Sequence, residues 1–158
     1  MIIMREINFS ELDRTLTDKV KEFNGHDIEF CYQCGTCTAS CPVFEVNADY
    51  NPRKIIRMLL LGMKEVLTED FVWLCSSCYA CQERCPQGVL IPELMRAVKN
   101  LAVSEGYTPE GVQEQYTKVI TEGVLYKPSS YDNRKRKRLG LEAIDDDYTD
   151  DAAKIFEG

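Results

Sequence analysis

Apolar residues recur at spacings of three and four along much of this chain, which places them on one face of a helix. The first such stretch follows Ser10, where Ser10 as N-cap and Asp13 three residues later form a variant of the capping box. Gly25 stands where this helix can end. The pattern predicts an N-terminal helix with an apolar face made of Leu12, Leu16, Val20 and Phe23.

A second helix is predicted between Asn51 and Gly62. Asn51 is a favourable N-cap, Pro52 suits the first helical position, and Gly62 can end the helix. Its buried face is predicted to be Ile55, Ile56, Leu59 and Leu60. A shorter helix is predicted after Thr68, carrying Phe71, Val72 and Leu74.

Two more helices are predicted in the second half of the chain. Pro92 opens one that runs to Gly106, and Thr108 with Pro109 opens another that ends before Gly123. Their apolar faces are Leu94, Met95, Val98 and Leu101 in the first, and Val112, Tyr116, Val119 and Ile120 in the second. Strand-like alternation is weak throughout, so the pattern predicts an all-α fold.

Eight cysteines stand in two short runs within this helical pattern. The first run contains Cys31, Cys34, Cys37 and Cys41, followed by Pro42. The second contains Cys75, Cys78, Cys81 and Cys85, followed by Pro86. Both read C-x2-C-x2-C-x3-C-P, and the second is the first displaced by 44 positions. Because no cysteine lies outside the pattern, all eight are candidates for one shared chemistry.

That chemistry is the binding of two iron–sulfur clusters. Three cysteines at three-residue intervals can wrap a loop around one face of a cubane, and each thiolate then reaches a different iron. In two-cluster proteins with this run, the cysteine before proline ligates the other cluster. The sequence therefore predicts two [4Fe–4S] clusters with crossed ligands: Cys31, Cys34, Cys37 and Cys85 for the first, and Cys75, Cys78, Cys81 and Cys41 for the second.

The connection between the runs bears on the fold. Small bacterial ferredoxins carry the same runs on a compact sheet, but here the segment from Cys41 to Cys75 can hold one full helix and a second short one. The sequence thus predicts an α-helical ferredoxin domain with the two clusters in loops between helices.

Other uses of paired cysteine runs fit less well. Disulfide frameworks belong to small secreted proteins, and zinc sites usually present two C-x2-C knuckles with four ligands in all. A purely structural cluster is a more serious alternative. Two clusters tied together by shared runs favour an electron relay, because a pair is the minimum for passing electrons onward.

Length and charge narrow the partners. The 158 residues suit one domain, or two small lobes with a tail. The net charge of −7 becomes more negative when cysteines ligate metal, which argues against nucleic acid. No apolar run approaches the roughly 20 residues of a membrane span, and no secretory signal is evident at the N-terminus. We therefore expect a cytoplasmic protein.

The residues between the cysteines, and those that connect the two runs, restrict the choice of family. Residues 31–42 read CYQCGTCTASCP, residues 51–58 read NPRKIIRM, and residues 73–86 read WLCSSCYACQERCP. These stretches resemble the iron–sulfur electron-transfer subunit, known as the C subunit, of CoB–CoM heterodisulfide reductase from methanogens, over about residues 28–106. The cysteine runs alone are shared with iron–sulfur domains of succinate dehydrogenase and with glycolate oxidase-type subunits. The sequence Cys-Tyr-Gln-Cys-Gly-Thr-Cys favours the heterodisulfide reductase branch.

The resemblance implies a place in a chain of carriers. In that family a flavin-containing iron–sulfur subunit supplies electrons to this small subunit, which passes them to a catalytic subunit. The catalytic subunit carries Cys-Cys-Gly motifs and cleaves the disulfide between coenzyme M and coenzyme B. This chain has no adjacent cysteines, so we expect a non-catalytic electron-transfer subunit of an oxidoreductase complex.

Two alternatives stay open at this point. One is a relay subunit of a 2-hydroxyacid oxidase or dehydrogenase complex, and the other is a non-redox protein with structural metal sites. The chain shows no G-x-G-x-x-G motif and no P-loop, so it signals no flavin, NAD or nucleotide site. Its only histidine, His26, is interpreted as a surface residue, and Trp73 as a packing residue.

The sequence divides into four predicted segments. Residues 1–26 form an N-terminal segment and helix, 27–106 the two-cluster domain, 107–126 an additional helix, and 127–158 a charged tail. The tail contains a basic run at 134–138 and an acidic one at 145–151. Such runs are usually solvated or disordered. Our hypothesis is that the tail becomes ordered against a partner subunit, since both signs of charge in one short arm suit recognition.

Overall fold

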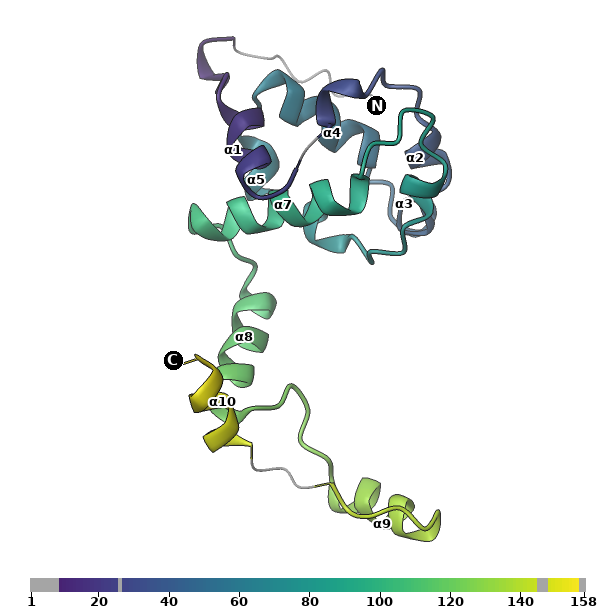
Figure 1. Ribbon diagram of the computed structural model, residues 1–158, viewed down its shortest axis with the longest axis vertical. Helices are drawn as coiled ribbons and strands as arrows, with labels where there is room; N and C mark the ends of the chain where they lie inside the picture. Colours follow the sequence, from purple (N-terminus) through teal and green to yellow (C-terminus); the bar gives the residue numbers. More distant parts are fainter. Residues whose placement is uncertain (1–8, 26, 145–147, 157–158) are drawn as a thin grey trace. The chain divides into compact units, whose positions relative to one another are not determined.

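The computed structural model describes residues 9–25, 27–144 and 148–156. Every regular element among these residues is helical, which confirms the predicted all-α class (Figure 1). The chain divides into two compact units, Met1–Tyr107 and Thr108–Gly158. None of the described helices combines the length and the apolar character that a membrane span requires. The predictions for residues 1–8, for His26 and for residues 145–147 concern positions outside the described residues.

The first α-helix begins later than the sequence predicts. A short 3-10 helix, η1 (Phe9–Glu11), precedes α1 (Leu16–Glu22), so Ser10 is not the N-cap. The reason is local: the Asp13 carboxylate accepts hydrogen bonds from the Thr15 N–H and hydroxyl, at 2.9 and 2.6 Å. This turn occupies the residues that would have formed the first helical turn. The predicted apolar face is confirmed in part, because Leu16 and Val20 are fully buried.

Helix α4 (Pro52–Leu61) matches its prediction at both ends. The Asn51 side chain accepts a hydrogen bond from the Lys54 N–H at 3.0 Å, and Pro52 occupies the first turn. Gly62 ends the helix in the left-handed conformation, with φ of 76°. The Gly62 carbonyl accepts a hydrogen bond from the Asp13 N–H at 2.8 Å, which joins this helix end to the N-terminal turn. Ile55, Ile56 and Leu59 are fully buried, whereas Leu60 is 37% exposed.

The short helix predicted after Thr68 occurs as the 3-10 helix η3 (Asp70–Leu74), which leads into the second cysteine run. It is preceded by a short helix that was not predicted, α5 (Glu65–Thr68). A corresponding 3-10 helix, η2 (Ile28–Phe30), leads into the first run. Of the residues expected on the apolar face, Val72 is buried and Leu74 is 42% exposed.

Helix α7 (Ile91–Ser104) is the central element of the first unit. It begins one residue before the predicted Pro92 and buries the four residues expected on its apolar face. It contacts α1, α5 and η3, and α1 also contacts α4. The core of the first unit therefore lies between α1, α4, α5 and α7, and it contains Leu16, Val20, Ile55, Ile56, Leu59, Val66, Leu94, Met95 and Val98.

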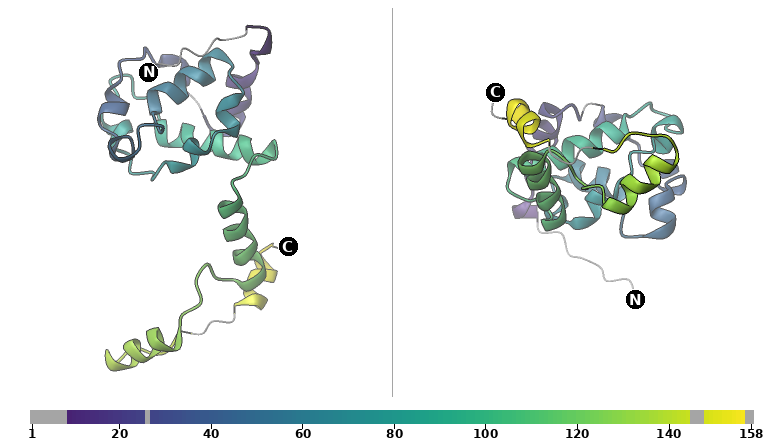
Figure 2. Two further views of the ribbon diagram at one scale, coloured as in Figure 1. Left: turned by 180° about the vertical axis from the view of Figure 1, so that it is seen from behind. Right: turned by 90° about the horizontal axis from the view of Figure 1, so that it is seen from below.

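The cysteine-bearing segments lie at the other end of this unit from α1 (Figures 1 and 2). Three short helices are associated with the runs. Helix α2 (Thr36–Ala39) lies within the first run, α3 (Pro42–Val46) follows it, and α6 (Ala80–Glu83) lies within the second run. Helices α2 and α6 contact each other, so the two runs face one another across a small interface. This end of the unit is held to the core by α4 and α7.

The second unit is built from α8 (Glu110–Glu122), α9 (Ser130–Arg138) and α10 (Thr149–Phe156). Helix α8 occurs where the sequence predicts it, and it contacts α10. Its expected apolar face is not buried, since Tyr116 is 58% exposed. Among the described residues of this unit only Ala152 is buried. The second unit therefore has almost no apolar core of its own.

Replacing Gly62 with alanine is expected to destabilise the first unit strongly. An alanine Cβ at this position would overlap the Asp13 backbone, and the left-handed conformation alone costs about 1–2 kcal/mol. Gly106→Ala is the matched control, because Gly106 has φ of 84° and a Cβ added there would have no other atom within 4 Å. Thermal unfolding should show a Tm decrease of about 8 °C or more for Gly62→Ala, and a smaller decrease for Gly106→Ala. Equal decreases would contradict the packing argument.

Candidate metal centres

Two cavities lie at the end of the first unit that carries the cysteine runs. The first cavity is lined by three cysteines of the first run and by Cys85 of the second; the three are Cys31, Cys34 and Cys37. The second cavity is lined by three cysteines of the second run and by Cys41 of the first; the three are Cys75, Cys78 and Cys81.

The two runs share one backbone conformation at equivalent positions. Gln33 and Ser77, 44 positions apart, both have positive φ, of 65° and 51°. Gly35 and Tyr79, also 44 positions apart, have φ of 86° and 64° and form the N-caps of α2 and α6. The second cysteine of each run, Cys34 or Cys78, thus stands between two residues in the left-handed conformation, and these turn the chain around its cavity. The third cysteine follows in the first turn of the short helix.

The fourth cysteine of each run points to the other half of the domain. Cys41 is the N-cap of α3, where Pro42 fixes the first helical turn, and Cys85 is followed by a turn in which the Gly88 N–H donates to its carbonyl at 3.1 Å. Because α2 and α6 pack against each other, these two cysteines border the opposite cavities. That they act as ligands stays a prediction.

The chemistry of the linings fits iron–sulfur clusters. All eight cysteines are free thiols, and among the described residues no His, Asp or Glu lines either cavity. A lining of thiols with apolar neighbours such as Ile56 and Val89 is the donor set of an iron–sulfur site. In the described part of the chain, no three His, Cys, Asp or Glu side chains are arranged to hold one metal ion. The four thiols of each cavity line a common space and do not converge on the position of a single metal ion.

The thiols differ in how readily they ionise. Burial raises the pKa of the Cys81 thiol to about 12, and burial also raises the pKa of Cys37. At Cys34 a hydrogen bond with the Thr36 hydroxyl lowers the pKa. Iron compensates the charge of a buried thiolate, so the two raised pKa values are compatible with sites that ionise as metal binds.

Comparisons with known proteins agree with this geometry. Residues 27–89 match the 4Fe-4S dicluster domain family. The C subunit of the H2:CoB–CoM heterodisulfide, ferredoxin reductase of Methanothermobacter thermautotrophicus is 33% identical over 144 residues, covering 89% of this chain and 77% of the relative. An iron–sulfur C subunit of the CoB–CoM heterodisulfide reductase of Methanocaldococcus jannaschii is 35% identical over 148 residues, covering 89% and 79%. The chain belongs to the family of heterodisulfide reductase C subunits.

A third relative widens the range of reductases. The C subunit of the ferredoxin:CoB–CoM heterodisulfide reductase of Methanosarcina mazei is 36% identical over 126 residues, covering 80% of this chain and 78% of the relative. C subunits thus occur in heterodisulfide reductases that are named for different electron donors. Membership of this family and the dicluster domain assign the chain to iron–sulfur electron transfer, as the sequence predicts.

In this C subunit, α4 is tied directly to the first cysteine run. The Thr38 hydroxyl donates to Asn51 Oδ1 at 2.8 Å and accepts from the Arg53 N–H at 3.1 Å. Thr38 lies in α2 next to Cys37, and its side chain is nearly buried, with 9% of the residue exposed. The hydroxyl therefore fixes the helix carrying Cys37 against the start of α4.

Two cavity residues were not anticipated from the sequence. Tyr50 is 2% exposed and lines the second cavity, and burial together with a hydrogen bond to Cys75 raises its pKa. Arg53 lines the first cavity, where its side chain passes over Gly35. The only available signal was their position beside the N-cap Asn51. Trp73 packs against the core, as expected, and the Lys99 Nζ lies 5.8 Å from its ring centroid.

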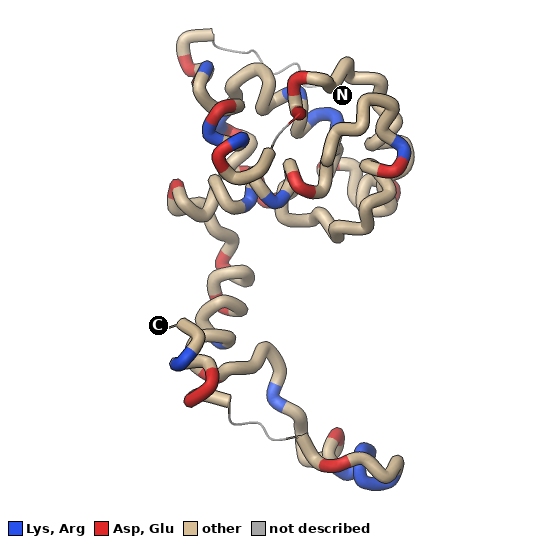
Figure 3. The backbone as a smooth tube through the Cα atoms, in the orientation of Figure 1, with Lys and Arg blue, Asp and Glu red and all other residues tan. Residues whose placement is uncertain are grey.

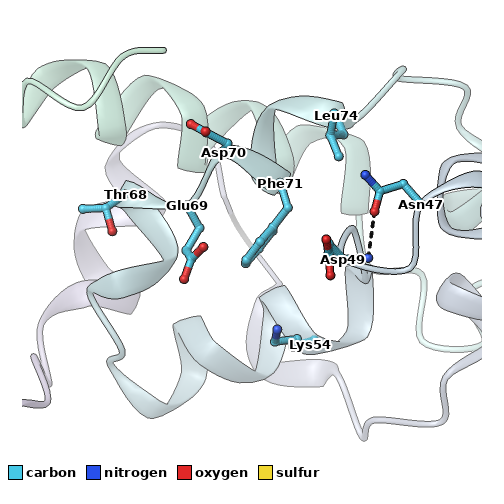
Figure 4. Close-up of a pocket in the computed structure, with 8 residues that line it drawn as sticks. All are labelled: Asn47, Asp49, Lys54, Thr68, Glu69, Asp70, Phe71 and Leu74. Atoms are coloured by element: carbon cyan, nitrogen blue, oxygen red, sulfur yellow. Dashed lines mark hydrogen bonds between the residues drawn. The ribbon is translucent and has the colours of Figure 1, made fainter. Parts of the chain in front are cut away.

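Figure 4 shows an open groove whose lining includes Asp49 and Leu74, the sequence neighbours of Tyr50 and Cys75 in the second cavity. Its lining residues come from the segment before Tyr50, from α4, from the end of α5 and from η3; they are Asn47, Asp49, Lys54, Thr68, Glu69, Asp70, Phe71 and Leu74. The Lys54 Nζ lies 5.1 Å from the Phe71 ring centroid, within the range of a cation–π contact. No cysteine lines the groove, and its main feature is a group of three carboxylates.

Removing the Thr38 hydroxyl is expected to loosen the first run. Thr38→Val keeps the shape of the side chain but leaves the Arg53 N–H without this acceptor, at a cost of about 1–2 kcal/mol. Thr38→Ser keeps the hydroxyl and serves as the control. Urea unfolding should show a lower midpoint for the valine variant than for the serine variant. A valine variant as stable as the unmodified protein would show that this link is unimportant.

Proposed function

We propose that the chain is the electron-relay subunit of a heterodisulfide reductase complex, working through two [4Fe–4S] clusters. The first cluster is held by Cys31, Cys34, Cys37 and Cys85, and the second by Cys75, Cys78, Cys81 and Cys41. The observation that carries the proposal is the composition of the two cavities, each lined by three cysteines of one run and the fourth of the other. Membership of the C-subunit family supports it.

The two cavities are close neighbours, which is what a relay requires. Pro52 lines the second cavity and Arg53 the first, and both stand in the first turn of α4. In the same way, Ile91 lines the first cavity and Pro92 the second, at the start of α7. Each of these helices therefore begins in the wall between the cavities. Short separation favours electron exchange between the two sites.

The same helix starts stabilise negative charge. A helix N-terminus carries the equivalent of about half a positive charge, and residues of the first turns of α4 and α7 line both cavities. When bound, a [4Fe–4S] cluster accepts and releases one electron at a time. The residues of this chain hold the two sites at a fixed separation, limit the access of water with apolar walls, and donate hydrogen bonds to cysteine sulfur. Two successive electrons can thus pass through one chain.

The partners follow from what this chain lacks. Disulfide cleavage needs two electrons and a site for the half-reduced intermediate, and this chain has neither adjacent cysteines nor a cysteine beyond the two sets. We therefore place it between a flavin-containing iron–sulfur subunit that supplies electrons and a Cys-Cys-Gly-containing subunit. The latter reduces the heterodisulfide of coenzyme M and coenzyme B. The relatives named as subunits of CoB–CoM heterodisulfide reductases support this assembly.

Iron content of paired cysteine variants tests the crossed assignment. The unmodified chain, purified without oxygen, is expected to hold about eight irons as two interacting clusters after reduction with dithionite. Cys31→Ala combined with Cys85→Ala should remove one cluster and leave about four irons, because both residues serve the first cluster. Cys75→Ala combined with Cys85→Ala should remove both clusters. Iron analysis and electron paramagnetic resonance measure these contents.

The opposite pattern would show uncrossed ligation. In that case the Cys75 and Cys85 pair would spare one cluster, and the Cys31 and Cys85 pair would spare none. Zinc in place of iron, with no signal after reduction, would overturn the relay itself.

We further propose that the charged C-terminal segment is an assembly arm that docks on a partner subunit with an acidic surface. Helix α9 contains five cations and one carboxylate, and its basic residues are clustered (Figure 3). A capping box formed by Ser129 and Asp132 stabilises the helix start. The Asn133 side chain bonds to both the N–H and the carbonyl of Ile144, which folds the following segment back onto the helix.

The apolar residues of this arm also lack cover. Leu139 is 77% exposed, Tyr131 56% and Leu141 49%, and α9 has no buried residue. Clustered exposed apolar and basic side chains on a small unit without a core are typical of a binding surface. An acidic partner surface matches the sign of α9, and the apolar residues supply the area buried on contact.

Truncation after Tyr126 is expected to abolish co-purification with partner subunits while leaving the iron content unchanged. A milder variant replaces Arg134, Lys135, Lys137 and Arg138 with glutamine and should weaken assembly most at low salt, where charge attraction is screened least. Lys118→Gln in α8 is the control for loss of a cation from the same unit. Intact assembly of the truncated chain would overturn this role.

A further inference from the structure

We infer that the first cluster has the higher reduction potential of the two, and that Thr36 and Arg53 are the main residues that make it so. An electron on this chain then rests on the first cluster, and transfer from the second to the first is favourable. The inference rests on the ligand sets proposed above. It comes from comparing residues that occupy equivalent positions in the two runs.

Hydrogen bonds to cysteine sulfur are concentrated on the first side. The Gln33 Nε2 donates to Cys31 Sγ at 3.4 Å, and a hydrogen bond joins Cys34 Sγ and Thr36 Oγ1 at the same distance. Once Cys34 is a thiolate its sulfur carries no proton, so the Thr36 hydroxyl is the donor.

The second run has smaller side chains in place of these donors. Its residues 44 positions further on are Ser77 for Gln33 and Ala80 for Thr36. Ala80 has no side-chain group that can donate to the sulfur of Cys78. The second side has one buried hydroxyl residue, Tyr50, which lines the second cavity together with Cys75. The side-chain donors are therefore more numerous on the first side.

The charged side chains near the two cavities also favour a higher potential for the first cluster. Arg53 lines the first cavity, and among the described residues no ion pair is formed by its guanidinium. The open groove, whose lining includes the sequence neighbours of Tyr50 and Cys75, carries the carboxylates of Asp49 and Asp70, and its one lysine lies over Phe71 (Figure 4). Lys99 adds a cation on this side, where its Nζ donates to the Cys75 carbonyl at 3.4 Å.

These features act on the potential because reduction adds one negative charge to a cluster. Hydrogen-bond donors and cations stabilise the reduced form and raise the potential, whereas carboxylates lower it. Solvent exposure differs little, since each set contains one exposed cysteine, Cys34 or Cys78. Cys37 is buried, which by itself favours the opposite order. The donors touch the ligand sulfurs directly, so their effect outweighs this difference.

A redox titration of the cluster-loaded full chain, followed by electron paramagnetic resonance, tests the order. Thr36→Ala is expected to lower the higher of the two midpoint potentials and to narrow the gap. At a fixed potential the ratio of reduced to oxidised first cluster should fall by about three- to tenfold, where tenfold corresponds to about 59 mV. Ala80→Thr installs the matching hydroxyl in the second run and should raise the lower midpoint. The reverse result, a fall in the lower midpoint with Thr36→Ala, overturns the order. Unchanged midpoints in this variant contradict the role of Thr36.

Arg53 provides a second test that does not touch a ligand contact. Arg53→Gln should lower the higher midpoint, and Arg53→Lys should restore most of it, because the effect requires the charge. Arg53 is exposed, so the glutamine variant should retain both clusters even if Thr36→Ala does not. Equal midpoints in Arg53→Gln and the unmodified chain contradict its role. An unmodified chain without two reducible clusters refutes the proposed function, and reducible clusters in the wrong order refute only this inference.

Discussion

Negative charge that must be held in a small volume governs this structure. Eight thiols border two adjacent cavities in a chain of 158 residues, and thiolates are costly to bury without positive partners. A bound [4Fe–4S] core would offset only part of that charge, and the starts of α4 and α7 lie in the wall between the cavities. The apolar core serves this arrangement, because packing among α1, α4, α5 and α7 fixes where the two helices begin.

Much of this architecture could be predicted where local chemistry decides the conformation. The start and end of α4 were predictable because Asn51, Pro52 and Gly62 each favour one position in a helix. The start of α1 was not, because Ser10 satisfies the sequence rule for an N-cap while the Asp13 carboxylate bonds to Thr15 instead. That competition also depends on Gly62, 49 positions away, whose carbonyl accepts from the Asp13 N–H.

Only part of the candidate site could likewise be predicted from the sequence. The grouping of cysteines followed from spacing, because each run has three thiols for one loop and a fourth beyond it. Tyr50 and Arg53 could not be assigned to the cavities, since their contacts depend on how the connection between the runs folds back. The contrast between Thr36 and Ala80 was visible in the sequence, but it acquires meaning only when the two runs are known to share a backbone conformation.

The shared conformation of the two runs also has an evolutionary consequence. Positive φ at the same two positions of each run, 44 residues apart, is what a duplicated segment would leave behind. Such a duplication is hard to reverse, because deleting either copy removes three thiols from one cavity and the fourth from the other. The two halves can still diverge in every side chain around the sulfurs, so ancestry fixes the cysteines and leaves their surroundings to selection.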